Sequence, residues 1–492
     1  MRFLWLDINV SYSHTSLALP ALHAQIGKDE ADVFTGVVFK VLYSTIKKEP
    51  FTLLNEILAF KPDFIFSTLW LFNSDYTLRL LRDLKTLNNG VKIVLGGPEF
   101  LGNNNSFLSE NKHIFAVFRG EGENQFASLA SALIKGEGTD KLPGICMLSP
   151  EGIYTDNGIA QVKSFPLLKY PESSPFFVWD RAYIQIETSR GCFNRCSFCV
   201  SGDCRKIENI DLEEIRRRIE NAYRHGVKNI RILDRTFNAN SERALQLLEL
   251  FRDFPEICFH VELHPAFLSP PLKEKLSSLP SSLLHIETGI QSLDDNVLNA
   301  CRRAGKSRES LEGLMFLTSL KKFTIHADII AGLPLYTYRQ LILDINTLIS
   351  TGTCEIQLEL LKLLPGTAII DDCDKYGIKY SSLPDYRVLE TDSITCKELW
   401  RVSVLSGIID LWYNRGGFRE FFQKIVPYSR NFIEDFLSHI ILRVSLDKSM
   451  TPLKRAVIMY DFCREHYPEH IHLVKQYWIK QGLPEKRYPE SS

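Results

Sequence analysis

Three cysteines lie close together in a chain that otherwise uses cysteine sparingly. Of eleven cysteines in 492 residues, Cys192, Cys196 and Cys199 form a C-x3-C-x2-C pattern. Three thiolates at this spacing can surround one face of a small centre built from a soft metal. A four-ligand zinc site completed by Cys204 is the competing interpretation, although a zinc ribbon would need a second CxxC pair. A [4Fe–4S] cluster with only three cysteines keeps one iron open, which favours catalysis over a structural role.

The strands and helices around the cysteines predict an open barrel. The cysteines follow the first of six strand-like runs, which alternate with helical patterns and show no antiparallel signal. Six successive strand–helix units predict a partial (β/α)6 barrel over residues 183–368, with its chemistry at the carboxyl ends of the strands. The predicted strands are Tyr183–Glu187, Asn229–Leu233, Cys258–Glu262, Leu284–Thr288, Thr324–Ile330 and Glu355–Leu361.

Residues 1–140 predict a separate α/β domain with a doubly wound, Rossmann-like sheet. Its predicted strands include Arg2–Ile8, Val33–Phe39 and Asp63–Thr68. Ligands on such sheets lie at the carboxyl ends of the strands, and glycines there let the backbone approach a ligand closely. Each loop alone is also ordinary turn chemistry, but four on one edge predict a site for a large flat ligand. These loops contain Asn9 to His14, Ser67 to Trp70, Gly96-Gly97-Pro98-Glu99 and Gly120-Glu121-Gly122-Glu123.

The remaining segments and the composition limit the class of protein. Prolines make residues 141–182 a linker with a possible hairpin at Ile145–Tyr154, and residues 369–492 predict a mainly helical C-terminal domain. Apolar residues make up 45% and charged residues 24%, with a net charge of -1, so the chain is globular and no nucleic-acid partner is expected. No apolar run could span a membrane, and Asp7 comes too early for a signal-peptide core. We therefore expect a cytoplasmic protein.

The cysteine loop resembles that of the radical SAM superfamily, in which SAM is S-adenosylmethionine. The likeness rests on the C-x3-C-x2-C loop after the first barrel strand, with the aromatic Phe198 before the last cysteine. Further blocks resemble the branch that also carries an N-terminal cobalamin-binding domain, in particular a subgroup with a helical C-terminal extension. These blocks are Asp234 to Asn238, Glu287 to Ser292, Ala331 to Pro334 and Leu361 to Thr367.

This resemblance implies roles for the residues around the barrel mouth. The three cysteines would bind a [4Fe–4S] cluster, and SAM would chelate its open iron and be cleaved reductively to a 5′-deoxyadenosyl radical. Phe198 and Leu333 would lie against the adenine. Polar strand-end residues would bind the ribose or methionine groups of SAM, with helix capping or salt bridging as the alternative. These residues are Asp234, Glu262, Glu287 and Gln291.

The resemblance also implies cobalamin on the N-terminal sheet. The Asp-x-His-x-x-Gly loop that supplies a cobalt-binding histidine in related carriers is absent. The lower face of the cobalamin would then meet a bulky side chain, for which Trp70 is the candidate and a core tryptophan the alternative. His14 is expected to be structural. The other candidate residues for this cofactor are Gly96, Gly97, Gly120 and Glu121.

The leading hypothesis is a cobalamin-dependent radical SAM methyltransferase that acts on an unactivated carbon of a small molecule. It would require an external electron donor such as flavodoxin or ferredoxin. A cobalamin-dependent rearrangement or cyclisation without methyl transfer is the alternative within the same chemistry. An RNA-modifying methylthiotransferase would need a second cluster from N-terminal cysteines, and the first 145 residues contain none. A non-catalytic zinc-binding module is the third class.

Overall fold

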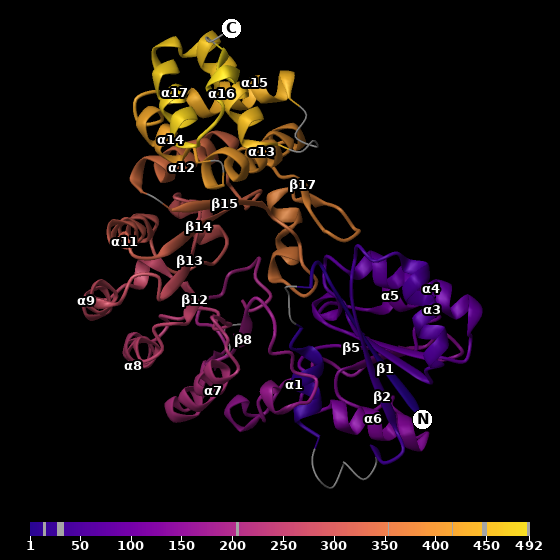
Figure 1. Ribbon diagram of the computed structural model, residues 1–492. Helices are drawn as coiled ribbons and strands as arrows, with labels where there is room; N and C mark the ends of the chain where they lie inside the picture. The colour runs from indigo at the N-terminus through magenta and orange to yellow at the C-terminus, as the bar shows by residue number, and fades with distance from the viewer. Residues whose placement is uncertain are drawn as a thin grey trace.

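The computed structural model describes residues 1–12, 16–26, 34–202, 206–352, 354–415, 417–444 and 450–489. His14, Cys204 and Val33, which the sequence analysis singled out, lie outside these described residues. Along the chain, an N-terminal sheet domain is followed by a barrel and then by a bundle of helices (Figure 1).

The N-terminal domain is the predicted doubly wound fold. Its seven strands are ordered β2-β1-β3-β4-β5-β6-β7, and the first five of the chain run parallel. Helices α3, α4 and α5 pack on one face, while α1 and α6 pack on the other. The strands are β1 (Arg2–Asn9), β2 (Val38–Thr45), β3 (Phe64–Thr68), β4 (Lys92–Gly96), β5 (Ala116–Phe118), β6 (Ile145–Leu148) and β7 (Tyr154–Asp156). The helices are α1 (Ala18–Ala24), α3 (Pro50–Phe60), α4 (Ser74–Leu87), α5 (Asn105–Glu110) and α6 (Phe126–Lys135).

Two details of this sheet differ from the sequence-based expectation. Strand β2 covers Val38–Thr45 rather than Val33–Phe39. It is an edge strand, so most of its side chains stay partly exposed and the hydrophobic pattern that marks a strand is weak. In addition, the hairpin expected at Ile145–Tyr154 forms β6 and β7, which extend the sheet antiparallel from β5. The N-terminal sheet therefore continues past residue 140.

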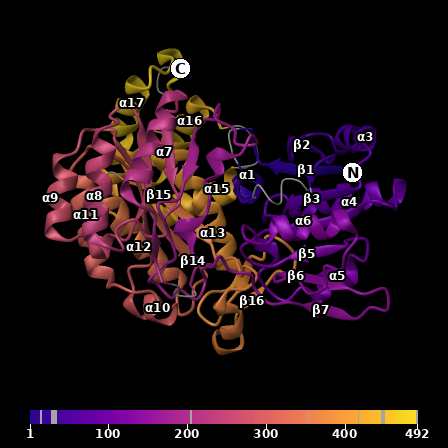
Figure 2. The ribbon, with the colours of Figure 1, turned by 90° about the horizontal axis from the view of Figure 1, so that it is seen from below.

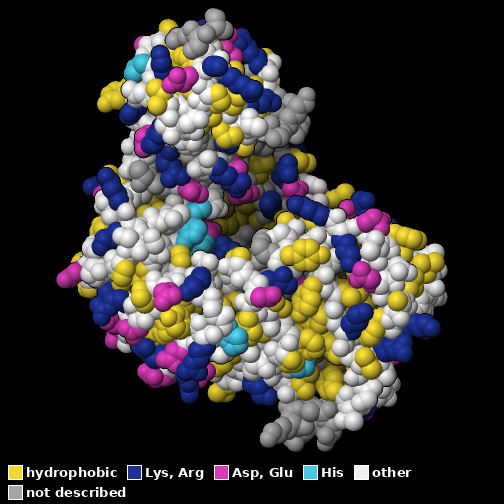
Figure 3. All heavy atoms as spheres, in the orientation of Figure 1, with side chains coloured by type: hydrophobic (Ala, Val, Ile, Leu, Met, Phe, Trp, Pro, Cys, Tyr) yellow, Lys and Arg dark blue, Asp and Glu magenta, His cyan; other side chains and the backbone are white. Residues whose placement is uncertain are grey.

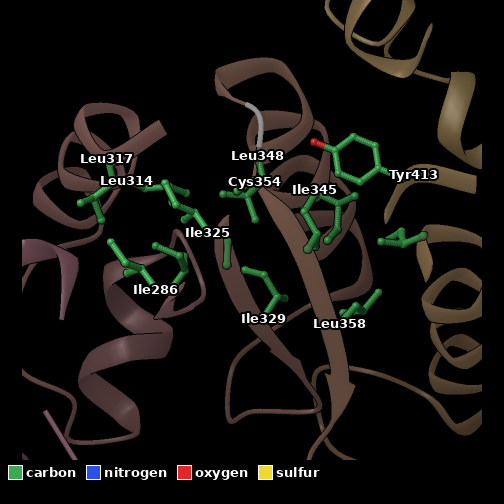
Figure 4. Packing of buried hydrophobic residues seen from close by; sticks show 14 of the residues in the cluster. Ile286, Leu314, Leu317, Ile325, Ile329, Ile345, Leu348, Cys354, Leu358 and Tyr413 are labelled. Carbon is green, nitrogen blue, oxygen red and sulfur yellow. The ribbon is translucent and has the colours of Figure 1, made fainter. Parts of the chain in front are cut away.

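The middle of the chain forms the predicted open barrel of six parallel strands, in the order β15-β14-β13-β12-β11-β8. Alternate residues face the helices and the barrel interior, as in β12, where Phe259 and Val261 are buried and His260 and Glu262 are half-buried. Figure 4 shows the apolar layer between the strands and the covering helices. The strands are β8 (Ile184–Ile186), β11 (Asn229–Ile232), β12 (Cys258–Leu263), β13 (Leu284–Gln291), β14 (Thr324–Ala331) and β15 (Glu355–Leu360). The helices are α7 (Leu212–Arg224), α8 (Ser241–Arg252), α9 (Pro270–Ser278), α10 (Asp295–Ala300), α11 (Ser307–Ser319) and α12 (Tyr338–Thr351).

The C-terminal helices cover the free edge of the barrel at β15. The side chain of Asn414 accepts a hydrogen bond from the backbone N–H of Ile356 (3.0 Å) and donates one to its carbonyl (2.8 Å). An amide side chain thus replaces a neighbouring strand at an edge that would otherwise be open to pairing. The elements are α13 (Cys396–Ile408), a π-helical turn (Ile409–Asn414), α14 (Arg419–Ile425), α15 (Phe432–Arg443), α16 (Pro452–His466) and α17 (Ile471–Lys480).

Most of the described aromatic residues of this region are core residues. Trp412, Phe422, Phe432 and Phe436 are fully buried, whereas Trp400 on α13 is exposed. Within the described residues, no helix combines the length and the apolar character that crossing a bilayer requires.

Candidate functional site

The cysteine loop begins at the carboxyl end of β8 and is fixed there by Asp234. The Asp234 carboxylate accepts hydrogen bonds from the backbone N–H groups of Thr188 (2.7 Å) and Ser189 (3.0 Å) and from the Thr188 hydroxyl. Asp234 follows β11 and is buried. All three donors are groups of Thr188 and Ser189, at the start of the loop. The role of the Asp234 carboxylate in the structure is therefore to hold this part of the backbone in place.

Backbone contacts hold the rest of the loop. The N–H of Ser197 donates to the carbonyl of Cys301, and the carbonyl of Ser197 accepts from the N–H of Ile369, both at 2.9 Å. Gly202 lies so close to the loop that a Cβ there would come within 2.2 Å of the carbonyl oxygen of Cys196. The loop is therefore positioned by β8, by the segment after α10 and by the segment that follows β15.

The electrostatics at the cysteines combine burial with nearby arginines. Burial raises the pKa of the Cys196 and Cys199 thiols above the ordinary value. Arg303 opposes this at Cys196, because its Nη1 lies 3.6 Å from the sulfur. A cation beside a thiol favours the thiolate, which is the form that binds metal. Sequence reasoning missed Arg303, and its only signal was the pair of arginines after α10.

The spacing of the sulfur atoms bears on the zinc alternative. Bonds of about 2.3 Å from one tetrahedral zinc ion to its sulfurs place those sulfurs about 3.8 Å apart. Among the described residues, the group of three potential metal ligands within 4.8 Å of one another is formed by His439, Glu465 and His466. Cys192, Cys196 and Cys199 do not form such a group, so at least one pair of their sulfurs lies more than 4.8 Å apart, which is wider than the spacing around one zinc ion.

Charged side chains line the barrel interior next to the loop. Glu262 and Glu287 are paired in the register of β12 and β13. His260 Nε2 lies 3.0 Å from the Glu287 carboxylate, and this contact lowers the pKa of Glu287, while burial, and then Glu287 itself, raise that of Glu262. The pKa values of these two glutamates thus shift in opposite directions. Glu287 is hydrogen-bonded to His260, whereas burial is the largest influence on Glu262.

Among the described residues, the interior polar atoms that are buried without a hydrogen-bond partner include one on β13 and one on β14 that face no cation partner in hydrogen-bond range. They are Oε1 of Gln291, at the end of β13, and Oδ1 of Asp328 on β14. Gln291 has a backbone φ of 66°, in the left-handed region, beside a bulge at Gly289. Buried polar atoms are normally paired, so these two atoms are candidates for binding a ligand. Sequence reasoning found Gln291 but missed Asp328, which lies in the middle of β14 rather than at its end.

The two apolar candidates differ in access. Phe198 is partly buried and packs against the barrel core. Leu333, in the turn after β14, is fully buried.

Figure 3 also shows histidine side chains in the hollow between the barrel and the C-terminal helices. The ring centroids of His260 and His285 are 4.6 Å apart, as are those of His285 and His326.

Trp70 lies at the carboxyl end of β3, next to β1 at the point where the strand order reverses. Its side chain is 41% exposed and stacks on Phe72, with ring centroids 6.5 Å apart. Asn73 holds this loop: its side chain accepts from the N–H of Trp70 and donates to the carbonyl of Ile8, both at 2.8 Å. An exposed aromatic surface at the switch point is the expected position for a flat ligand and does not fit a core tryptophan.

The glycines of the same edge are explained by contacts within the protein. A Cβ on Gly97 would lie 2.4 Å from the carbonyl oxygen of Leu69, and one on Gly120 would lie 2.3 Å from that of Ala160. Both glycines also have positive φ. Gly96 is half-buried at the end of β4, and a Cβ there would meet only ordinary contacts. Close packing of the backbone therefore accounts for Gly97 and Gly120 without a ligand.

The glutamates of these loops connect the N-terminal domain to the rest of the chain. Arg190, two residues before Cys192, contacts Glu123 at 2.9 Å, Glu121 at 3.5 Å and Glu187 at 2.6 Å. Glu121 also accepts from the N–H of Val162 at 2.7 Å. We call Arg190 with these three glutamates the Arg190 clamp.

A second contact joins the same two parts. Tyr386, beyond the barrel, donates to the Glu99 carboxylate at 2.8 Å. Loops of the N-terminal sheet are thus bound both to the cysteine loop and to the segment after the barrel, and the two domains lie side by side (Figure 2).

Family models match three segments of the chain. The B12 binding domain model matches residues 8–130, the radical SAM superfamily model matches residues 186–348, and a model described as a protein of unknown function (DUF4080) matches residues 374–476. These segments correspond to the N-terminal sheet, the barrel and the C-terminal helices.

Curated proteins with similar sequences include an uncharacterized methyltransferase of Pyrococcus horikoshii. It is 27% identical over 51% of this chain and 56% of its own length. The cobalamin-dependent radical SAM methyltransferase TokK of Streptomyces tokunonensis is 23% identical over 65% of this chain and 50% of its own length. The chain thus spans about half the length of these relatives.

Among solved structures, the cobalamin-dependent S-adenosylmethionine radical enzyme OxsB with aqua-cobalamin and S-adenosylmethionine bound has the same fold. The TM-score is 0.63 at 16% identity, with 98% of this chain and 79% of that chain covered. The matched models show that this chain carries a B12-binding domain followed by a radical SAM domain.

Proposed function

We propose that this protein is a cobalamin-dependent radical SAM methyltransferase that methylates an unactivated carbon of a small molecule. The observation that carries the proposal is the joining of the cysteine loop, through the Arg190 clamp, to the carboxyl edge of the B12-type sheet. This arrangement would keep two cofactors near one substrate. The names of the similar Pyrococcus and Streptomyces proteins, both methyltransferases, support the same reaction class.

The residues fit the proposed cofactors. Cys192, Cys196 and Cys199 would hold a [4Fe–4S] cluster, and Arg303 would favour the thiolate form of Cys196. Glu262, Gln291 and Asp328 offer polar atoms in the adjacent interior for SAM, and Trp70 offers an exposed aromatic face for the corrinoid. When bound, the cluster with SAM would supply a 5′-deoxyadenosyl radical, and cobalamin would supply a methyl group. An external reductant such as flavodoxin or ferredoxin would provide the electron.

Some of the predicted residues would touch a cofactor directly, and others would act through neighbouring residues. Phe198 is accessible enough to lie against the adenine, whereas Leu333 would support that surface from within the core. Asp234 would act through the loop that it holds. Gly96 leaves room for a close backbone approach, and Glu121 would act through the Arg190 clamp rather than by binding the corrinoid.

The test is cofactor analysis and turnover of the anaerobically purified protein. We expect iron, sulfide and corrinoid in the wild type, and reductive cleavage of SAM that is lost in Cys196→Ala. Appearance of both 5′-deoxyadenosine and S-adenosylhomocysteine is expected for methyl transfer. Deoxyadenosine without S-adenosylhomocysteine would indicate the alternative, a cobalamin-dependent rearrangement or cyclisation. Cleavage that survives in Cys196→Ala, or a zinc-loaded protein without iron, would overturn the proposal.

A further inference from the structure

A second group of metal-ligand side chains lies in the C-terminal helical domain, on elements separate from the cysteine loop. His439 belongs to α15, while Glu465 and His466 are the last two residues of α16. Their donor atoms all lie within 4.8 Å of one another. From these residues we propose a zinc site that joins α15 to the C-terminal end of α16.

The distances are close to those that zinc requires. Oε2 of Glu465 lies 3.9 Å from Nδ1 of His439 and 3.8 Å from Nε2 of His466. Bonds of about 2.0–2.1 Å in a tetrahedral site separate neighbouring donors by about 3.3–3.4 Å. Each histidine nitrogen would therefore move by roughly half an ångström relative to the carboxylate oxygen to reach this spacing, and the two nitrogens lie within 4.8 Å of each other. Two imidazoles and one carboxylate form a donor set that zinc commonly uses, with further positions left for water.

An unpartnered nitrogen supports the site independently of this spacing. His439 is only 5% exposed, and its Nδ1 is buried without a hydrogen-bond partner. A buried imidazole nitrogen normally has a partner, but this one lies 3.9 Å from the Glu465 carboxylate, too far for a hydrogen bond. A metal ion between the two groups would satisfy the nitrogen.

Arg443 is the group that competes with the ion. Its Nη1 lies 2.6 Å and 2.5 Å from the two oxygens of Glu465. A carboxylate has about four lone-pair sites, so Arg443 leaves sites on Oε2 for the ion and would become the partner that orients this ligand. The dipole of α16 also favours a cation at its C-terminal end, where His466 lies. The site is thus suited to zinc but is weakened by the positive charge of Arg443.

Zinc binding by the full chain tests the proposal. The cysteines are kept out of the measurement in two ways: by using cluster-loaded protein, and by using a variant with Cys192, Cys196 and Cys199 all replaced by alanine. Zinc is titrated in competition with a chromophoric chelator. We expect one equivalent bound in both proteins, and the result with the alanine variant does not depend on the proposed function.

Matched variants assign the site. His466→Gln changes an exposed side chain and should weaken zinc binding by at least about tenfold, since changes in surrounding partners alone cost about 10–100-fold. Arg443→Gln should strengthen it by about threefold to tenfold by removing a like charge. His472→Gln, at an exposed position of α17, is the control and should bind as the wild type does. Equal affinity in wild type and His466→Gln, or an anomalous scattering peak for zinc away from these side chains, would overturn the proposal.

Discussion

At the scale of single residues, carboxylates of similar sequence context perform different tasks. Asp234 holds the backbone of the cysteine loop, Glu121 contributes to the Arg190 clamp, and Glu262 faces the barrel interior with a raised pKa. Asp234 and Glu121 follow predicted strands, and Glu262 is the last residue of one. What separates them is the set of donors around each one: backbone N–H groups, a guanidinium group or no comparable partner.

Asp7, at the end of β1, provides a prediction about pH. Burial raises the pKa of its carboxyl from 3.8 to about 6, although Asn9 and Arg181 partly oppose this. The folded state therefore favours neutral Asp7, whose contribution to stability is complete below pH 3.8 and is lost as the pH rises through about 6. Asp7→Asn, which stays neutral, should be more stable than the wild type at pH 8 by up to about 3 kcal/mol.

The measurement is the thermal unfolding midpoint as a function of pH. The difference between Asp7→Asn and wild type should grow between pH 4 and 7 and disappear at lower pH. Asp83→Asn, at an exposed position on α4, is the control and should follow the wild-type profile. A difference that does not depend on pH would contradict this prediction.

At the scale of elements, the cysteine loop depends on close backbone contact. It has little regular structure of its own and is held by β8, by the segments after α10 and β15, and by the approach of Gly202 to Cys196. A loop fixed at several points keeps its thiols in place before a cofactor binds, which reduces the free-energy cost of binding.

Gly202→Ala should therefore disrupt the loop. The new Cβ would meet a carbonyl oxygen at 2.2 Å, and backbone atoms cannot move away as a flexible side chain can. We expect iron incorporation after anaerobic reconstitution to fall severalfold while the far-ultraviolet circular dichroism stays unchanged. Gly90→Ala is the matched control, since its Cβ would meet only Asn88 at 3.6 Å. Normal iron content in Gly202→Ala would show that the loop tolerates the shift.

At the scale of the whole molecule, the relative position of the B12-type sheet and the barrel is set by polar contacts. The Arg190 clamp gathers three carboxylates around one guanidinium group, and its side chains are largely buried. The Tyr386–Glu99 hydrogen bond adds a second point of attachment. Two points separated along the interface hold the domains more firmly against rotation than one point does.

Arg190→Met should loosen this junction. Methionine keeps much of the side-chain bulk, but Glu121, Glu123 and Glu187 would then face one another without a cation. Breaking a buried ion pair in this way costs about 3–5 kcal/mol, and partial exposure reduces this to about 2–4 kcal/mol here. We expect calorimetry to resolve a separate, earlier transition for the N-terminal domain, more clearly when Tyr386→Phe is added.

An exposed ion pair provides the comparison. Arg79→Met removes the contact with Asp75 on α4, where both side chains are more than 70% exposed, and should cost less than about 0.5 kcal/mol. If Arg190→Met melts in a single transition at the wild-type temperature, the clamp does not determine the docking of the domains.

The sequence alone determined the order of the three domains, the class of each and the residues of the cysteine motif. These features are local: strand and helix periodicity repeats every few residues, and Cys192, Cys196 and Cys199 lie on one short loop. Five of the six barrel strands were predicted to within about one residue at both ends. β13 continues three residues beyond its predicted end, to Gln291. The misplaced β2 is the edge strand, whose weak burial leaves little pattern to detect.

Only the tertiary structure decided which residues meet across long stretches of chain. Arg303 reaches Cys196 from more than a hundred positions away, Arg190 meets Glu121 and Glu123, and His439 faces Glu465 from another helix. None of these pairs has a fixed spacing in the sequence. They arise because parallel strands and packed helices bring distant loops to one edge, and folding fixes that edge through the sum of many contacts.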